Sequence, residues 1–291
     1  MIDFKNVTKI VTHPGHAHRD DFLSVCFVLA MCSQHQNMPS VYRRDPTEHE
    51  LKDPNIVVID IGERHEPELS NFDHHQFPRD HKPCCALSLI LQNMTIYEEA
   101  NRGFRWLTVT EKFDSKGPYE VAKDIGVDWN TISDATFSPV EEAVLHLFAK
   151  TFDGGQSGIY LGLMTTIGTE LLNTLEMFTG RWQQLSDSLT TTSVNGNEIV
   201  FSLGILGDND PSFALSAYVE ENHPNAVATI THDDRGDGYC LFRLNDSSKI
   251  DFSKIENDEH VLFAHKNGFV AKTHTTISNE KLIELLEKSS K

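Results

Sequence analysis

Short apolar runs alternate with helical repeats over the first ninety residues. Three segments predict strands: residues 9–12, 40–42 and 55–61. The last of these is a continuous apolar run, as found in strands that are buried on both faces of a parallel sheet. Apolar residues recur at helical spacing behind Asp20, the expected N-cap, and residues 86–93 predict another helix. Strands alternating with helices predict an α/β domain with a mostly parallel sheet.

The middle of the chain is rich in helical patterns. Ser138 as cap and Pro139 at the first helical position mark one helix start. Two further helices are expected at about residues 161–178 and 182–189. The composition changes abruptly over residues 190–197, where we expect a linker or a hairpin turn.

A second sheet is expected beyond that change. Short strand-like runs follow one another, and a helix closes the series: residues 198–203, 226–231, 239–244, 261–264 and the helix 279–288. These elements predict a second, smaller α/β domain. The predicted division is a metal-binding catalytic domain over residues 1–190 and a substrate-binding domain over residues 191–291.

The charge of the chain limits its partners. The formal net charge is −18, whereas a protein that coats duplex DNA needs a basic surface to displace counterions from phosphates. An acidic protein can still act on phosphates when cations stand between its carboxylates and the substrate. The charge therefore favours a short or small phosphorylated substrate that is bound through metal ions.

Targeting signals and a disulfide framework are not expected. No apolar stretch approaches the ~20 residues that span a bilayer, and the first residues lack a basic region followed by an apolar one. The five cysteines, two of them adjacent, are an odd and poorly spaced set for disulfides. We expect a cytoplasmic protein with no membrane partner, and the sequence leaves oligomerisation open.

Polar clusters follow the expected strand ends, where ligands bind in open α/β sheets. There are four of them: residues 13–21, Asp60, residues 73–76 and Asp114. Taken alone, each has an ordinary structural explanation as a solvated loop, a helix cap, a turn or a partly buried histidine. Nine of the 15 histidines nevertheless lie at or before His81, which indicates a site in this half of the chain. Imidazole and carboxylate together suit Mn²⁺, Fe²⁺ or Zn²⁺.

The order of these clusters resembles the DHH phosphoesterase superfamily. That superfamily includes RecJ-like exonucleases, oligoribonucleases, cyclic-dinucleotide phosphodiesterases and family II inorganic pyrophosphatases. The similarity is greatest to its melanocyte-proliferating-gene branch, formerly called metal-dependent protein hydrolases. Matching residues of the first motif are Thr12, His13, Gly15, His18, Asp20 and Asp21, and residues 261–269 resemble the Phe-x-His-x-x-Gly-Phe ending of that branch.

The resemblance implies a site for two divalent ions, with Mn²⁺ expected and Mg²⁺ or Fe²⁺ as alternatives. Six residues would form it: His13, His18, Asp20, Asp60, His74 and Asp114. His13 and His18 would hold one ion, Asp20, His74 and Asp114 the other, and Asp60 would bridge both. His18 stands where many members of the superfamily have aspartate.

The resemblance also implies catalytic and substrate-binding residues. Asp60 and His75 would be catalytic, with His75 facing the phosphate as donor or general acid. Four consecutive residues would contact the substrate from the second domain: His265, Lys266, Asn267 and Gly268. Gly268 would permit close backbone approach.

The sequence departs from this branch in three places. Asp21 replaces a glutamate, and residues 115–117 read Ser-Lys-Gly where Asp-Asn-Gly is usual after Asp114. The stretch between Tyr239 and Val261 is also shorter than in relatives. These departures leave open a different choice of substrate or a loss of activity.

Three functions are compatible with these residues. The first, which the resemblance favours, is a metal-dependent phosphodiesterase acting as a 3′–5′ exonuclease on short RNA or oligonucleotides. The second is a hydrolase of a small phosphorylated metabolite or signalling nucleotide, such as a phosphatase, a pyrophosphatase or a cyclic-dinucleotide phosphodiesterase. The third, a non-enzymatic metal-stabilised binding protein, would require a broken ligand set, whereas all six expected ligands are present.

Overall fold

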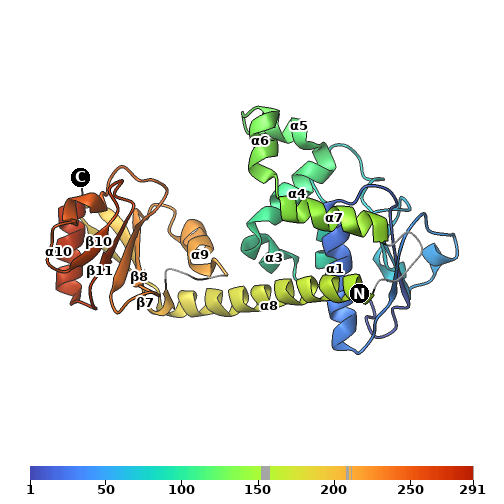
Figure 1. The fold of residues 1–291 in the computed structure, drawn as a ribbon, viewed down its shortest axis with the longest axis horizontal. Helices are drawn as coiled ribbons and strands as arrows, with labels where there is room; N and C mark the ends of the chain where they lie inside the picture. Colours follow the sequence, from blue (N-terminus) through green and yellow to red (C-terminus); the bar gives the residue numbers. More distant parts are fainter. Residues whose placement is uncertain (152–157, 208–209, 211, 291) are drawn as a thin grey trace. The chain divides into compact units, whose positions relative to one another are not determined.

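The computed structural model describes residues 1–151, 158–207, 210 and 212–290, which form two compact units. The first unit is Met1–Leu175 and the second is Glu176–Lys291. The division falls inside helix α8 (Gly158–Ser188), which therefore contributes to both units (Figure 1). The sequence places the boundary further along, at residues 190/191, where α8 has ended and the first strand of the second unit begins.

A mostly parallel sheet organises the first unit. Its strands are β1 (Lys9–Thr12), β2 (Ser40–Arg43), β3 (Ile56–Ile59), β4 (His65–Glu66) and β5 (Asn71–Phe72). Their order in the sheet is β2-β1-β3-β5-β4, and of the described pairs only β4–β5 is antiparallel. The predicted parallel sheet is thus confirmed, although β3 is shorter than the apolar run over residues 55–61.

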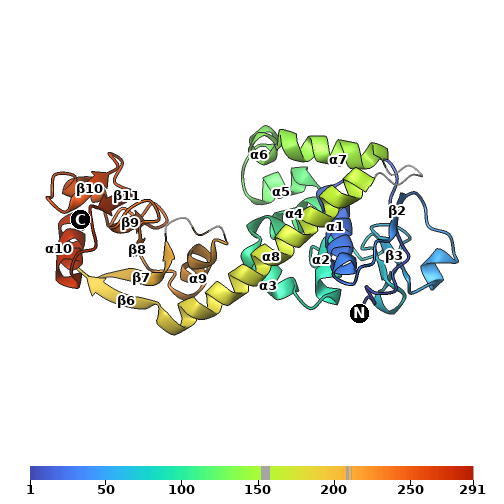
Figure 2. The same ribbon diagram turned by 60° about the horizontal axis from the view of Figure 1, so that its bottom comes forward.

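Helices cover the sheet and fill the rest of the first unit. They are α1 (Arg19–Gln34), α2 (Ala86–Asn93), α3 (Tyr97–Gly103), α4 (Arg105–Lys116), α5 (Pro118–Asp124), α6 (Trp129–Thr136) and α7 (Pro139–Thr151). Helices α1 and α2 pack on each other (Figure 2), and α1 contacts β3 whereas α2 contacts β5. Fully buried side chains such as Phe27, Ile59, Phe72 and Phe148 form the core between these layers.

Two expectations about helices are corrected. The N-cap of α1 is His18 rather than Asp20, which lies inside the first turn. The helices expected at about residues 161–178 and 182–189 are one continuous helix, α8. Gly180 lies within this helix, and a Cβ built on it would contact no atom beyond the neighbouring backbone of the helix itself. The intrinsic cost of a helical glycine, about 1 kcal/mol, is not enough to end the helix.

The second unit is built on another sheet. Its strands are β6 (Thr190–Val194), β7 (Asn197–Gly207), β8 (Ala228–His232), β9 (Tyr239–Arg243), β10 (Val261–Ala264) and β11 (Val270–Thr273), in the order β10-β11-β9-β8-β7-β6. Strands β6 and β7 form a hairpin, as expected for residues 190–197. The pair β7–β8 is parallel and the other described pairs are antiparallel.

Helices pack on both faces of this second sheet. Helix α10 (Asn279–Ser289) shares a core with Ile199 and Phe201 of β7, whereas helix α9 (Ala214–Asn222) packs with Val200 of the same strand. Successive residues of a strand point to opposite faces, so the two helices lie on opposite sides of the sheet. The mixed α/β character expected for both halves of the chain is confirmed.

Candidate metal centre

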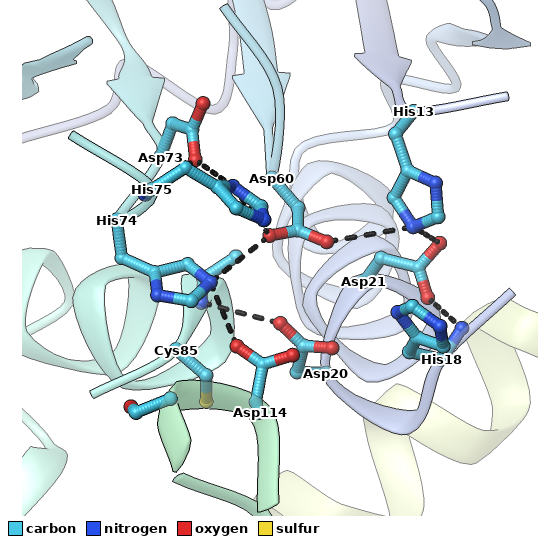
Figure 3. Close-up of polar contacts among 12 residues, drawn as sticks. His13, His18, Asp20, Asp21, Asp60, Asp73, His74, His75, Cys85 and Asp114 are labelled. Atoms are coloured by element: carbon cyan, nitrogen blue, oxygen red, sulfur yellow. Dashed lines mark hydrogen bonds and ion pairs between the residues drawn. The ribbon is translucent and has the colours of Figure 1, made fainter. Parts of the chain in front are cut away.

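The carboxyl ends of three neighbouring parallel strands bring polar residues to one edge of the first sheet. His13 directly follows β1, Asp60 follows β3, and Asp73 follows β5. Figure 3 shows the side chains of His13 and Asp60 pointing toward one another, with Asp73 bonded to His75 beside them. The expected convergence at this edge is therefore present in the structure.

His74 follows Asp73 in the loop after β5, and two helices supply three further side chains of the group. His18 and Asp20 lie at the start of α1, where the backbone N–H groups of the first turn favour negative charge. Asp114 lies in the last turn of α4, not after a strand as its place among the sequence clusters suggested. The backbone around Asp114 is held by Ser115, whose hydroxyl accepts from the Cys84 N–H at 2.9 Å and donates to the Cys84 carbonyl at 2.6 Å.

The six expected ligands form two groups that share Asp60. One group is His13, His18 and Asp60, and the other is Asp20, Asp60, His74 and Asp114; within each group one ligand atom per residue lies within 4.8 Å of the others. His13 Nε2 is 3.4 Å from Asp60 Oδ2, and His74 Nε2 is 3.4 Å from Asp60 Oδ1. Asp60 thus presents one oxygen to each group (Figure 3).

The polar atoms of this cluster lack ordinary partners. Several are buried and have no hydrogen bond of suitable geometry with the described residues: His13 Nε2, Asp60 Oδ1, His74 Nε2 and Asp114 Oδ2. Buried polar atoms are costly unless they are bonded to something. His13 Nδ1 lies 2.8 Å from the Pro14 carbonyl, and an N–H there would leave the lone pair of Nε2 facing the cluster. The donor set therefore fits divalent cations.

The pKa values of the cluster reflect crowded negative charge. Burial, together with the charges of Asp60 and Asp114, raises the pKa of Asp20 well above its usual value. Burial also raises the pKa of Asp60. Burial disfavours a charged ring at His74, yet the nearby carboxylates of Asp114 and Asp60 raise its pKa to about 10. The raised pKa values mean that Asp20, Asp60 and His74 bind protons more readily than usual when no cation is present. Positive charge from protons or cations offsets the repulsion among the carboxylates.

His74 and His75 differ in their surroundings although they are adjacent. The His74 side chain is 8% exposed and lies 2.7 Å from Asp114 Oδ2, whereas the His75 side chain is 59% exposed. His75 Nδ1 lies 2.6 Å from Asp73 Oδ1, and this hydrogen bond raises the pKa of His75. His75 also lies near enough to Asp60 and His74 to share a cation with them, but its Nδ1 is already engaged by Asp73.

Arg43 is a residue of this region that the sequence reasoning missed. Its side chain is buried at the end of β2, where its Nη2 donates to the carbonyls of Gly15 (3.4 Å) and His16 (3.1 Å). Its Nη1 lies 3.4 Å from Asp21 Oδ2, and Asp21 Oδ2 lies 3.2 Å from His13 Nε2. Arg43 therefore fixes the loop that carries the two histidines. Its position directly at a strand end was the signal that could have identified it.

The residues expected to contact substrate lie in the second unit, in the turn between β10 and β11. The Gly268 N–H donates to the His265 carbonyl at 2.7 Å, which closes the turn, and Lys266 and Asn267 are exposed at its tip. Gly268 has a φ of +68°, and a Cβ there would lie 2.0 Å from Asp251 Oδ1. The space beside Gly268 is thus occupied by Asp251 of the protein itself.

Comparisons with known proteins identify relatives of the N-terminal part of the chain. Residues 9–83 match the family model MYG1_exonuc, described as an uncharacterised protein family (UPF0160). A stretch of 68 residues is 35% identical to the MYG1 exonuclease of Rattus norvegicus and spans 23% of this chain and 17% of that protein. The resemblance to the melanocyte-proliferating-gene branch is confirmed over this segment, which holds five of the six expected ligands but not Asp114.

Two solved structures resemble the chain distantly. RecJ from Thermus thermophilus in complex with Mn²⁺ has a TM-score of 0.28 and 10% identity, covering 98% of this chain and 51% of that one. An exopolyphosphatase-related protein from Bacteroides fragilis also has a TM-score of 0.28 and 10% identity, covering 98% and 92%. At this TM-score neither likeness supports an inference about this chain.

Proposed function

We propose that this protein is a divalent-metal-dependent phosphodiesterase that acts as a 3′–5′ exonuclease on short RNA or oligonucleotides. The observation that carries the proposal is the pair of ligand groups that share Asp60, whose buried nitrogen and oxygen atoms face one another without a hydrogen bond of suitable geometry. The match of residues 9–83 to an exonuclease family supports the nuclease chemistry.

The position of each side chain indicates its proposed role in the reaction. Two divalent ions held by the six ligands, with Mn²⁺ best suited to the imidazoles, would neutralise phosphoryl oxygens and lower the pKa of the attacking water. Asp60 orients both halves of the site because one oxygen faces each group. Arg43, through the carbonyls that it holds, keeps His13 and His18 in place.

His75 is the proposed proton donor. It is exposed beside a buried cluster, and its bond to Asp73 orients the ring and favours the protonated form. A protonated imidazole in this position can donate to the leaving oxygen of a phosphodiester. The neighbouring His74, being buried against Asp114, is placed to bind a cation instead.

The strong acidity favours a second candidate, a hydrolase of small phosphorylated molecules. A net charge of −18 repels a long polyanion more than a mononucleotide or pyrophosphate. The chemistry at Asp60 and His75 would be the same, so the two candidates differ only in what binds beyond the scissile phosphate.

A substrate screen tests both candidates. The Mn²⁺-loaded protein is incubated with short RNA, short DNA, cyclic dinucleotides and pyrophosphate, and label at the 5′ or 3′ end reports the direction of attack. Release of mononucleotides from the 3′ end supports the first candidate, and release of phosphate from small molecules alone supports the second. Asp60→Asn should abolish either activity, whereas the matched control Asp80→Asn, at an exposed position, should not. Metal binding without any hydrolysis would favour a non-enzymatic protein.

We further propose a reducing compartment such as the cytoplasm. All five cysteines are buried thiols that form no disulfide, including the adjacent Cys84 and Cys85. Reduced thiols are the usual state there. Within the described ranges, no helix combines the length and apolar character required to cross a bilayer.

A further inference from the structure

The second unit has an open cavity at one end of its sheet. It lies between the turn that follows β9 and the turn between β10 and β11, which come together because the Arg243 N–H donates to the Phe269 carbonyl at 2.8 Å. Six residues line it: Phe242, Arg243, Asn245, Asp246, Asn267 and Phe269. None of them belongs to the candidate metal centre.

Aromatic rings form one wall of this cavity. Phe242 is 44% exposed although it lies in a strand, and its ring centroid is 6.4 Å from that of Phe269 at an interplanar angle of 75°. Leu241 packs in the core under α10, so Phe242 points to the other face of the sheet. On that face α9 packs with Val200 of β7 and with Leu244, which follows β9, and the exposure of Phe242 shows that the described residues leave much of its ring uncovered.

The polar part of the cavity is electrically balanced. Arg243 donates to the carboxylate of Asp246, so the two charges offset each other. The Nε of Arg243 is buried and has no hydrogen-bond partner among the residues that the structure describes. Asn245 and Asn267 add two exposed amides, each with donors and an acceptor.

These features select the ligand chemistry. A free phosphate would meet the carboxylate of Asp246, and an aliphatic side chain would leave the amides and the arginine N–H unused. A planar heteroaromatic ring can contact the phenylalanine faces while its edge atoms bond to the amides, which is how proteins bind unpaired bases.

We propose that this cavity, the base pocket, binds a nucleobase of the substrate. The inference rests on the proposed function only in that the substrate is then a nucleotide or an oligonucleotide. It adds that recognition in the second unit comes from stacking and edge contacts with the base, and that the phosphate is not the group recognised there.

Binding of a mononucleotide to the full-length chain tests this proposal. The protein is kept in chelator so that no cation can hold the phosphate, and AMP is compared with ribose 5-phosphate by calorimetry and by saturation-transfer NMR. We expect AMP to bind at least tenfold more tightly, with the strongest saturation at the adenine protons.

Three variants locate the binding. Phe242→Ala should weaken AMP binding about tenfold, equivalent to about 1.4 kcal/mol of stacking free energy. Asn245→Gly removes an amide while keeping the backbone unstrained, because Asn245 has a φ of 50° that glycine adopts readily, and it should weaken binding several-fold. Phe263→Ala is the matched control, since Phe263 is 47% exposed on β10, the edge strand of the same sheet, but does not line the cavity; this variant should bind AMP normally.

Two results would overturn the proposal. One is equal affinity for AMP and ribose 5-phosphate, and the other is an equal effect of Phe242→Ala and Phe263→Ala. Because binding is measured without metal and without turnover, its failure is distinct from a failure of the proposed hydrolysis. If the protein binds AMP through Phe242 but hydrolyses no substrate, the base pocket is supported and only the proposed nuclease activity is contradicted.

Discussion

Asp60 occupies a conformation that few residues adopt. Its φ is 57°, in the left-handed region directly after β3, and its carboxylate faces both ligand groups. Aspartate and asparagine tolerate this region better than most residues. Replacement by asparagine therefore changes the charge of the side chain without straining the backbone.

Substitutions of Asp60, His74 and His75 should have different effects. Asp60→Asn should be the most damaging, because both ligand groups lose their shared carboxylate. His74→Ala should lower metal content and activity together, whereas His75→Ala should keep the metal but lower kcat by a factor of about 10²–10⁴. Bound metal and kcat are measured on the same preparations. Full metal content and a near-normal rate in Asp60→Asn would contradict the two-metal mechanism.

Arg43 offers a second test at the residue scale. Arg43→Lys keeps the charge but cannot reach Asp21 and the two loop carbonyls together. We expect a loss of about 2–4 kcal/mol in the free energy of unfolding, since groups buried with this arginine lose their partner. Urea unfolding of the metal-free protein measures it, with the exposed Arg79→Lys as control. Equal stability of the two variants would show that Arg43 does not hold the loop.

At the scale of elements, α8 packs very closely on α1. A Cβ on Gly168 would lie 2.1 Å from the Cys26 carbonyl oxygen, whereas Gly162 in the same helix has open space. Gly168→Ala should therefore destabilise the first unit by about 1–3 kcal/mol through overpacking. Gly162→Ala should stabilise it by about 0.5–1 kcal/mol, because alanine is the better helix former. Thermal unfolding compares the two, and stabilisation by both would refute the close contact.

The elements also show how far the sequence predicts this fold. The strand at Lys9–Thr12 and the helix at Ala86–Asn93 have the expected bounds, because apolar periodicity and turn residues mark them clearly. The break expected between residues 178 and 182 is absent, because Gly180, the single glycine there, has too little effect to end a helix of this length. Local sequence patterns therefore predict helices and strands well where turn residues or changes in apolar periodicity mark their ends.

The candidate site was predictable only in part, because some of its residues are brought together by long-range packing that no local pattern signals. His13 and Asp60 could be placed together because parallel strands end at one edge. Asp114 could not be placed from its surroundings, since it lies on a helix whose approach to the sheet depends on long-range packing. Arg43 lies at the end of a strand, which marks it as a candidate, but only its long-range contacts show that it holds the loop before α1. The metal-binding roles themselves stay predictions.

At the scale of the whole molecule, the two units have separate hydrophobic cores. We expect two thermal transitions, of which Mn²⁺ raises only the one belonging to Met1–Leu175, by an amount that grows with the ratio of free ion to Kd. Calorimetry with and without chelator, compared with Asp60→Asn, measures this shift. An equal shift of both transitions would contradict a metal site confined to the first unit.

The same transition should depend on pH in the metal-free protein. The pKa of His74 is raised to about 10, so its protonated form stabilises the fold fully below about 6.5, the unfolded value. That stability is lost as pH rises toward 10. Tm of the first unit should fall over this range without metal, and His74→Gln should flatten the fall. An unchanged slope in the variant would assign the effect to other groups.

The spacing of the ligands along the chain has a consequence for folding kinetics. About a hundred residues separate His13 from Asp114, and Asp60 and His74 lie between them. Loops of this length must close before all six side chains meet, so the complete site forms only after the sheet edge and α4 have assembled. Interactions that form after the transition state change the rate of unfolding and leave the rate of folding unaffected. A bound cation would therefore prolong the lifetime of the folded first unit without helping the chain to reach it.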